Sequence, residues 1–274
     1  MKQQPGDMHG NRFVFIGGLH RSGTSLLHEI LRSHPEISGF SGTGVPEDEG
    51  QHLQTIYPPA NQYGGPGRFG FDSASFMDEE HPLATDQNAA ELLDQWRAYW
   101  DTSKSWLLEK SPPNLVRTRF LQSLFPRCRF IILLRHPIAV AYATSKWCRS
   151  SIPTLIEHNL RCYERFLADL PRLNHVYVLR YEELVQNPHN HIGRIFDWLD
   201  VEPFAFPQVV RSDINAKYLE QWRQDGLGVK GCGIKLTGFF HRFEKRAEVF
   251  GYSINNPDIL LSTKVTGLYG ETVD

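Results

Sequence analysis

The sequence predicts a three-layer α/β fold in which helices flank a central, mostly parallel sheet. Short apolar runs alternate along the chain with segments of helical periodicity, as in parallel strands joined by right-handed helical crossovers. The first apolar run also leads directly into a turn rich in glycine and hydroxyl residues, and then into a helix. Ligands of such sheets bind beyond the carboxyl ends of the strands, so this turn is the first place to look for a site.

The strands are predicted from short apolar runs that end at polar or turn residues. The run at 129–134 contains no polar residue from Phe130 to Leu134, as expected of a strand that is buried on both faces. The predicted strands are 13–16, 105–109, 129–134 and 176–179.

The helices are predicted from apolar residues at three- and four-residue spacing. The first helix follows the glycine-rich turn and should end near Pro35, because proline cannot continue a helix. At 86–100, the residues Leu92, Leu93 and Trp96 share one face. The other predicted helices are 114–124, 138–147, 155–167 and 191–199.

A long segment from about residue 38 to 84 is rich in glycine, proline and polar residues, with one helical turn expected at 51–56. Loops of this length tend to be lids or binding segments. A chain of 274 residues can bury a sizeable core. We therefore expect a single domain over 11–274 that carries this insertion, preceded by a flexible N-terminus at 1–10.

Composition excludes several classes of protein. The chain has 29 basic and 31 acidic residues, so no basic footprint for nucleic acid is expected. Its four cysteines show no C-x-x-C spacing, which is typical of reduced thiols in a cytoplasmic protein. There is no signal peptide and no run near the roughly 20 apolar residues that span a bilayer, so we expect no transmembrane segment in this chain.

The turn after the first strand is suited to an anion. Backbone N–H groups in the first turn of a helix have no partner and carry partial positive charge. Hydroxyl groups and a guanidinium add to these donors, from Arg21, Ser22, Thr24 and Ser25. An ordinary turn with a helix-capping serine is the alternative interpretation.

The same turn lacks the parts of a nucleoside triphosphatase. The spacing from Gly18 to Gly23 matches a Walker loop, but Thr24 occupies the position of the phosphate-binding lysine. The strand at 129–134 ends in Arg135 rather than a magnesium-binding aspartate. No histidine, cysteine or carboxylate spacing predicts a metal site either.

Arg135 predicts a second anion site at the end of its strand. A guanidinium there is costly unless it meets an anion, although a structural ion pair with an acidic residue would also satisfy it. Two anion sites at two strand ends suggest a ligand with two separated phosphate groups.

These motifs together resemble the sulfotransferases that use 3′-phosphoadenosine-5′-phosphosulfate (PAPS). The loop at 18–25 is similar to their 5′-phosphosulfate loop, and Arg135 to their 3′-phosphate motif. The segment Leu-Arg-Tyr-Glu-Glu-Leu at 179–184, followed by Asn-Pro at 187–188, extends the likeness, which runs in order from about 13 to 199 and more weakly over 215–222 and 250–252. The Arg-Ser-Gly-Thr form of the loop is closest to tyrosylprotein and bacterial sulfotransferases.

The resemblance implies a P-loop-like fold and transfer of a sulfuryl group from PAPS to a hydroxyl or amine, without a metal. It implies that the 5′ side is held by Arg21, Ser22, Gly23, Thr24 and Ser25, the 3′-phosphate by Arg135, and the nucleoside by Tyr181. One position departs from the family pattern, because Ala143 replaces the usual serine eight residues after Arg135. Either Thr144 substitutes, or other residues such as Lys146 hold the 3′-phosphate.

By the same resemblance, Lys110 stabilises the transferring sulfate, and Arg21 shares the task. The alternative for Lys110 is a surface lysine paired with Glu109. The histidine base of the cytosolic branch is absent, since its position holds Pro112. The tyrosylprotein branch uses a glutamate in the loop after the first helix, which makes the base Glu49, then His52, then Glu47 in order of preference.

Two other functions stay open from the sequence. A P-loop kinase acting on a small molecule would require magnesium, and a non-catalytic module would bind PAPS or its product without turnover. The acceptor cannot be read from the sequence: peptide tyrosine, a lipid or polyketide hydroxyl, a sugar and a small phenol all fit. The oligomeric state is equally unreadable.

Overall fold

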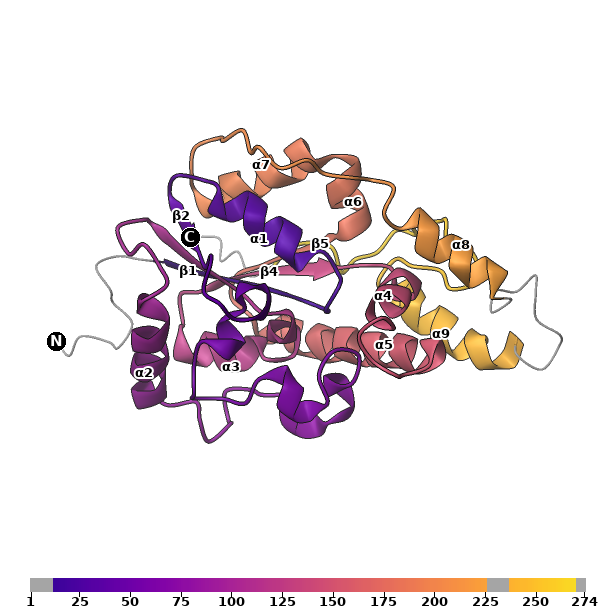
Figure 1. The fold of residues 1–274 in the computed structure, drawn as a ribbon, viewed down its shortest axis with the longest axis horizontal. Helices are drawn as coiled ribbons and strands as arrows, with labels where there is room; N and C mark the ends of the chain where they lie inside the picture. Colours follow the sequence, from indigo (N-terminus) through magenta and orange to yellow (C-terminus); the bar gives the residue numbers. More distant parts are fainter. Residues whose placement is uncertain (1–11, 226–236, 270–274) are drawn as a thin grey trace.

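The computed structural model describes residues 12–225 and 237–269, and contains a six-stranded sheet in the order β2-β3-β1-β4-β5-β6 (Figure 1). The first five strands in this order pair in parallel, and β6 pairs antiparallel with β5. The predicted, mostly parallel sheet is therefore confirmed. The strands are β1 (Arg12–Gly18), β2 (Ile37–Gly39), β3 (Trp106–Lys110), β4 (Arg129–Leu134), β5 (Val176–Arg180) and β6 (Gly267–Tyr269).

Helices cover both faces of the sheet, as Figure 1 shows. One face carries α1 (Thr24–Arg32), α6 (Tyr181–Gln186) and α7 (Pro188–Leu199). The opposite face carries α2 (Asp86–Arg97), α3 (Thr118–Leu124) and α5 (Ile152–Asp169), while α4 (Pro137–Thr144), α8 (Ala216–Gln224) and α9 (Thr237–Val249) lie beyond the carboxyl ends of β4 and β5.

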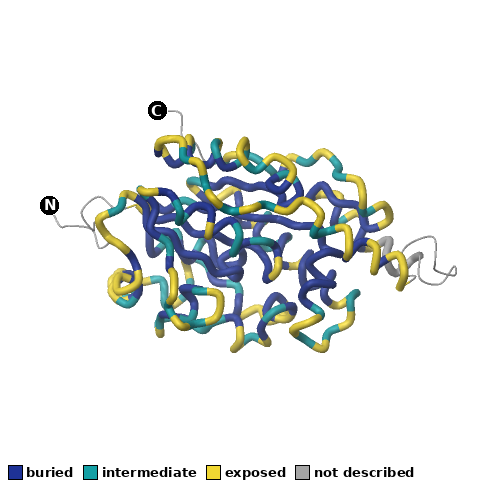
Figure 2. The backbone as a smooth tube through the Cα atoms, turned by 45° about the horizontal axis from the view of Figure 1, so that its top comes forward, coloured by how far each residue is buried: buried dark blue, intermediate teal, exposed yellow. Residues whose placement is uncertain are grey.

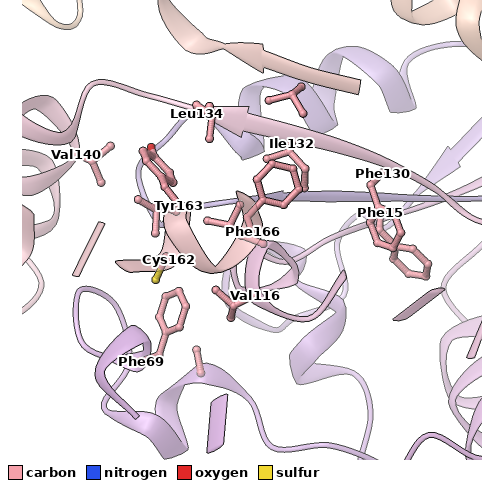
Figure 3. Packing of buried hydrophobic residues seen from close by; sticks show 14 of the residues in the cluster. Phe15, Phe69, Val116, Phe130, Ile132, Leu134, Val140, Cys162, Tyr163 and Phe166 are labelled. Atoms are coloured by element: carbon pink, nitrogen blue, oxygen red, sulfur yellow. The ribbon is translucent and has the colours of Figure 1, made fainter. Parts of the chain in front are cut away.

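Successive side chains of each strand point to opposite faces of the sheet, so that two apolar clusters form, one on each face of the sheet. In β1, Phe13 and Phe15 belong to the cluster under α2, α3 and α5, whereas Val14 and Ile16 belong to the one under α1 and α7. Figure 3 shows part of the first cluster, in which the rings of Phe15 and Phe130 on neighbouring strands lie 5.8 Å apart with a tilt of 30°. Figure 2 shows buried backbone running through the middle of the molecule.

Several predicted boundaries are wrong. The helix expected at 114–124 is a 3₁₀ turn (Pro112–Val116, η6) followed by α3, because Arg117 has non-helical dihedral angles. The helix expected at 138–147 ends at Thr144, and the turn expected at 51–56 is the 3₁₀ helix Gly50–His52 (η2). Five elements were not predicted from the sequence: β2, β6, α6, α8 and α9.

The segment predicted as a long insertion, from about residue 38 to 84, lies between β2 and α2. It contains only short 3₁₀ helices, the first of which is Pro46–Asp48 (η1). Ion pairs from Arg119 of α3 to Asp78 and Glu79 attach its far end to the domain. Cys128, Cys148 and Cys162 are free thiols, while Cys232 and the N-terminus at 1–10 lie outside the described residues.

Candidate active site

The turn between β1 and α1 has the backbone geometry of a tight anion-binding loop. Arg21 and Gly23 have positive φ angles, of 68° and 101°. A Cβ atom at position 23 would lie 2.5 Å from the ring of Tyr181, so only glycine fits. Ser22 is fully buried and closes the loop, since its N–H donates to the carbonyl of Leu19 (2.9 Å) and its Oγ accepts from the N–H of Leu19 (3.2 Å).

Arg135 lies at the carboxyl end of β4, beside this loop. Its Nη1 donates to the carbonyl of Arg21 (2.6 Å), and its Nε and Nη2 both donate to Oδ1 of Asn215 (2.9 and 2.7 Å). The guanidinium lies 4.1 Å above the ring centroid of Tyr181. Among the described residues, no carboxylate forms an ion pair with Arg135, so the structural ion pair considered from the sequence is not found, and its charge remains available to an anion.

Asn215 is held in turn by Glu182. The amide Nδ2 of Asn215 donates to Oε1 of Glu182 (2.6 Å), which also accepts from the N–H of His136 (3.0 Å). The other oxygen of Glu182 accepts from the hydroxyl of Tyr252 (3.1 Å). Glu182 therefore fixes Asn215, and Asn215 fixes Arg135. This role of Glu182 was not predicted from the sequence, because its partners Asn215, His136 and Tyr252 lie in separate segments of the chain.

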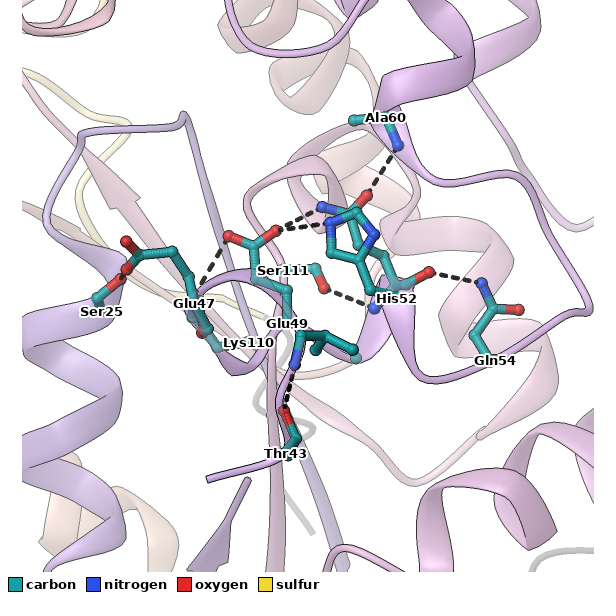
Figure 4. Close-up of polar contacts among 12 residues, drawn as sticks. Ser25, Thr43, Glu47, Glu49, His52, Gln54, Ala60, Lys110 and Ser111 are labelled. Carbon is teal, nitrogen blue, oxygen red and sulfur yellow. Dashed lines mark hydrogen bonds and ion pairs between the residues drawn. The ribbon is translucent and has the colours of Figure 1, made fainter. Parts of the chain in front are cut away.

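The predicted catalytic side chains come together on the other side of the loop (Figure 4). The Nζ of Lys110 lies 2.7 Å from the carbonyl oxygen of Glu47 and 3.4 Å from Oε1 of Glu49. The side chains of Lys110 and Glu49 are only 1% and 6% exposed, so Lys110 is not a surface lysine. The carboxylate of the exposed Glu47 accepts from the Oγ of Ser25 (2.9 Å) and so contacts the anion-binding loop.

The loop that carries these glutamates has an uncommon backbone. Glu47 and Asp48 both have positive φ angles, of 54° and 49°, a conformation that is costly for residues with side chains. The carboxylate of Asp48 compensates by accepting from both the N–H (2.8 Å) and the hydroxyl (2.6 Å) of Thr43. These bonds hold the pKa of Asp48 below its ordinary value despite the opposing effect of burial.

Burial sets the protonation of the candidate bases. It raises the pKa of Glu49, and the neighbouring Lys110 partly offsets this rise. Burial and the charge of Lys110 lower the pKa of His52, whose Nε2 lies 3.9 Å from Oε2 of Glu49. A carboxylate with a raised pKa is a stronger base than an ordinary one, so the environment of Glu49 suits a proton acceptor.

Glu109 is the neighbour of Lys110 in β3, but it does not form an ion pair with it. It is completely buried, and its Oε1 accepts from the hydroxyl of Ser111 (2.5 Å) and the N–H of Gly50 (3.0 Å). Its Oε2 accepts from the side-chain amide of Asn114 (2.5 Å). Burial nevertheless raises the pKa of Glu109 to about 7. Glu109 thereby connects the end of β3 to the loop that carries Glu49.

A pocket of about 290 Å³ joins the two halves of the site. Eight predicted residues line it: Arg21, Gly23, Thr24, Ser25, Glu47, Glu49, Arg135 and Tyr181. Four others do not line it, namely Ser22, His52, Lys110 and Thr144. The hydroxyl of Thr144 instead donates to the carbonyl of His20 (3.4 Å), underneath the anion-binding loop.

The pocket wall also contains residues that the sequence analysis did not predict as site residues. His20 lies in it, and burial keeps its imidazole neutral by lowering its pKa to about 3. Trp147 covers the guanidinium of Arg21 at 4.7 Å, and the ammonium of Lys217 lies 4.9 Å from the ring of Tyr218. No local pattern identifies His20, Trp147 or Lys217, because they reach the pocket from separate parts of the chain: the turn after β1, the turn after α4, and α8.

Two further properties concern the described part of the chain. Over residues 12–225 and 237–269, no group of three or more histidine, cysteine or acidic side chains is arranged to hold a metal ion. In the same ranges, no helix combines the length and apolar character needed to cross a membrane.

Comparison with known proteins connects this geometry to one family. The family model described as "Sulfotransferase family" matches residues 14–205. Nodulation protein NoeE of Sinorhizobium fredii is 26% identical over 219 residues, covering 69% of this chain and 50% of that protein. Protein-tyrosine sulfotransferase 2 of Gallus gallus is 23% identical over 205 residues, covering 69% and 51%. The chain thus spans about half the length of these curated relatives.

Solved structures share the fold. The sulfotransferase domain of the Synechococcus PCC 7002 olefin synthase has a TM-score of 0.52 at 19% identity, covering 92% of this chain and all of that domain. The sulfotransferase domain from the curacin biosynthetic pathway has a TM-score of 0.50 at 16% identity, covering 87% and 98%.

Proposed function

Since the chain belongs to the sulfotransferase family, we propose that it transfers a sulfuryl group from PAPS to a hydroxyl or amine of an acceptor. The observation that carries the proposal is the pocket between the two halves of the site. The anion-binding loop and Arg135 line one side of it, and Glu49, with Lys110 behind it, lines the other.

The residues present fit the nucleotide donor. The guanidinium of Arg135 is held by neutral acceptors, which supports a role in binding the 3′-phosphate. The glycine required at position 23 and the N–H groups at the start of α1, which Gly23 cannot cap with a side chain, support binding of the 5′-phosphosulfate by residues 21–25. Tyr181, packed under Arg135, would contact the nucleoside.

The reaction follows from the other half of the site. Glu49 takes the proton of the acceptor hydroxyl, and the acceptor oxygen forms a bond to sulfur while the bond from sulfur to the 5′-phosphate oxygen breaks. Adenosine 3′,5′-bisphosphate is the leaving group. Lys110 and Arg21 stabilise the charge that develops on the transferred oxygens, so no metal is required. Glu47 and His52 are the alternative bases.

The proposal also covers the domain organisation, the cellular compartment and the class of acceptor. We infer a single domain that acts in the cytoplasm on an acceptor other than nucleic acid. The acceptor would enter beside Glu49, where the wall combines Pro112 with the aromatic ring of Trp147.

The direct test is transfer of ³⁵S from labelled PAPS to a panel containing a peptide tyrosine, a long-chain alcohol, a sugar and a simple phenol, without magnesium. Labelled product, together with release of adenosine 3′,5′-bisphosphate, is the expected result. Tight binding of the nucleotide with no transfer to any acceptor would instead indicate a binding module. Phosphate transfer from magnesium-ATP to any of these acceptors would indicate a kinase.

A further inference from the structure

Gln51 lies two residues after the candidate base, in η2, and is 1% exposed. Its amide Nε2 donates to Oε2 of Glu49 at 2.5 Å. A hydrogen bond from a buried amide to a buried carboxylate is strong, because the low local dielectric leaves it unscreened. Gln51 is thus a direct partner of the group proposed to accept the proton.

The orientation of this amide is determined by its other end. The Oε1 atom of Gln51 accepts from the backbone N–H of Ala60 at 2.8 Å. Since an N–H group can only donate, the oxygen must face Ala60 and the NH₂ group must face Glu49. The contact with Glu49 is therefore a donor contact, and rotating the amide would lose both bonds.

The backbone of Gln51 is equally fixed. Its N–H donates to the Oγ of Ser111 (3.0 Å), and the N–H of the preceding Gly50 donates to Glu109 (3.0 Å). A Cβ atom at position 50 would lie 2.5 Å from Cγ of Glu109. Glu109 of β3 and the following Ser111 therefore hold the backbone at 50–51, whereas Ala60, the first residue of the 3₁₀ helix Ala60–Tyr63 (η3), holds the side chain of Gln51.

The two oxygens of Glu49 consequently have different partners. Oε2 is bound by Gln51, with His52 at 3.9 Å, and Oε1 faces Lys110 at 3.4 Å. The ionisable groups around Glu49 are Lys110 and Glu109 of β3, His52 of η2 and Glu47 of η1. Gln51 is the uncharged member of this environment.

We propose that Gln51 is a positioning residue that holds Oε2 of Glu49 and thereby presents Oε1 to Lys110 and to the acceptor proton. The inference rests on the proposed function, in which Glu49 is the base. It predicts that Gln51 controls the pH dependence of transfer through Glu49, in addition to supporting the loop.

The test is the variant Gln51→Glu. It keeps an oxygen for the N–H of Ala60 but sets a second carboxylate against Oε2 of Glu49. Two carboxylates in contact cannot both ionise easily, so their pKa values separate. We expect the acidic limb of the kcat/KM profile to move upward by about one pH unit or more, with kcat reduced and the affinity for adenosine 3′,5′-bisphosphate unchanged.

Gln54→Glu is the matched control. Gln54 supports the same loop, since its amide donates to the carbonyls of Gln51 (3.0 Å) and Tyr57 (2.7 Å), but it makes no contact with Glu49. We expect this variant to alter thermal stability without moving the acidic limb. If both variants move the limb equally, or if a folded Gln51→Glu leaves it in place, the proposal is wrong.

A measurement that does not depend on sulfuryl transfer tests the role of Gln51 separately from the proposed sulfotransferase function. The ¹³C shift of the labelled Glu49 carboxyl, assigned with Glu49→Gln, gives the pKa of Glu49 directly. We expect it to rise in Gln51→Glu and, if that variant does not fold, in Gln51→Met, which fills the same space without a donor. An unchanged titration in the folded variant overturns the role of Gln51 even if the protein transfers sulfate. A raised pKa without transfer by the wild type supports that role and counts against the proposed function.

Discussion

The Nζ of Lys110 and Oε1 of Glu49 lie 3.4 Å apart in a site where both side chains are almost fully buried. A buried pair is costly to break, because removal of one partner leaves the other charge without compensation. In the proposed mechanism, the ammonium group of Lys110 therefore has two roles. It stabilises the negative charge that develops on the transferred oxygens, and it lies beside the carboxylate of the base, Glu49.

For Lys110→Ala, we expect kcat to fall on the order of 10²-fold or more, while the affinity for adenosine 3′,5′-bisphosphate stays nearly unchanged. Burial raises the pKa of Glu49 and Lys110 opposes this rise, so the acidic limb should also move to higher pH in the variant. Steady-state kinetics and calorimetry on one preparation check both effects. A folded variant with full turnover contradicts the assignment of Lys110.

The second prediction separates the two candidate glutamates. Glu49 is buried beside Lys110, whereas Glu47 is exposed and bound to Ser25. Glu49→Gln should lower kcat by roughly 10²–10⁴-fold with nucleotide affinity retained, the range expected for a lost general base. Glu47→Gln should retain most of the turnover, because only a surface hydrogen bond changes. The reverse ranking in kcat would identify Glu47 as the base.

Arg135→Ala tests the 3′-phosphate site. We expect the affinity for adenosine 3′,5′-bisphosphate to weaken by roughly 2–4 kcal/mol, as for the loss of a charge-assisted contact. Calorimetry with the nucleotide measures this change. Arg211→Ala is the control, since Arg211 is exposed and forms an ion pair with the nearby Asp213 (3.0 Å). Equal affinities for the wild type and the folded Arg135 variant would remove Arg135 from the site.

Glu109 gives a prediction about stability. Burial raises its pKa from 4.5 to about 7 in the folded chain, so folding favours the protonated form. The contribution of Glu109 to the free energy of unfolding is therefore complete below about pH 4.5 and is lost as the pH rises through about 7. Urea unfolding at several pH values measures this effect. The free energy of unfolding of the wild type, relative to that of Glu109→Gln, should decrease between about pH 4.5 and about pH 7.

Glu79→Gln is the control, because the pKa of Glu79 is lowered on folding, whereas that of Glu109 is raised. Arg119 lowers the pKa of Glu79 from 4.5 to about 2, so its contribution is present above about pH 4.5 and is lost as the pH falls toward 2. The difference in free energy of unfolding between the wild type and Glu79→Gln should therefore stay constant from about pH 5 to 8. If the Glu109→Gln difference is also constant there, the carboxyl of Glu109 does not titrate in that range.

Local patterns were sufficient to predict four of the six strands and the anion-binding loop. A strand such as 129–134 is recognised because its apolar run is contiguous, and the loop at 18–25 because its glycines and donors are adjacent in sequence. Arg135 was identified because it directly follows a buried strand. Short elements such as β2 and β6 have too few residues to establish a period, and were missed.

The supporting contacts could not be predicted, because they join residues that are distant in the sequence. Asn215 meets Arg135 across 80 positions, and Gly50 meets Glu109 across 59. Nothing in the sequence near Asn215 indicates that it contacts Arg135. The contact forms because α8 packs against α4 in the folded chain. For the same reason, the contact of Thr144 with the carbonyl of His20 emerges only from the folded chain.

The most direct test of the proposed donor site is calorimetry of the wild-type protein without magnesium, comparing adenosine 3′,5′-bisphosphate with ADP. We expect tight binding of the 3′-phosphorylated nucleotide and much weaker binding of ADP, because ADP leaves Arg135 without its anion. Equal affinities, or a preference for ADP that strengthens when magnesium is added, would contradict it.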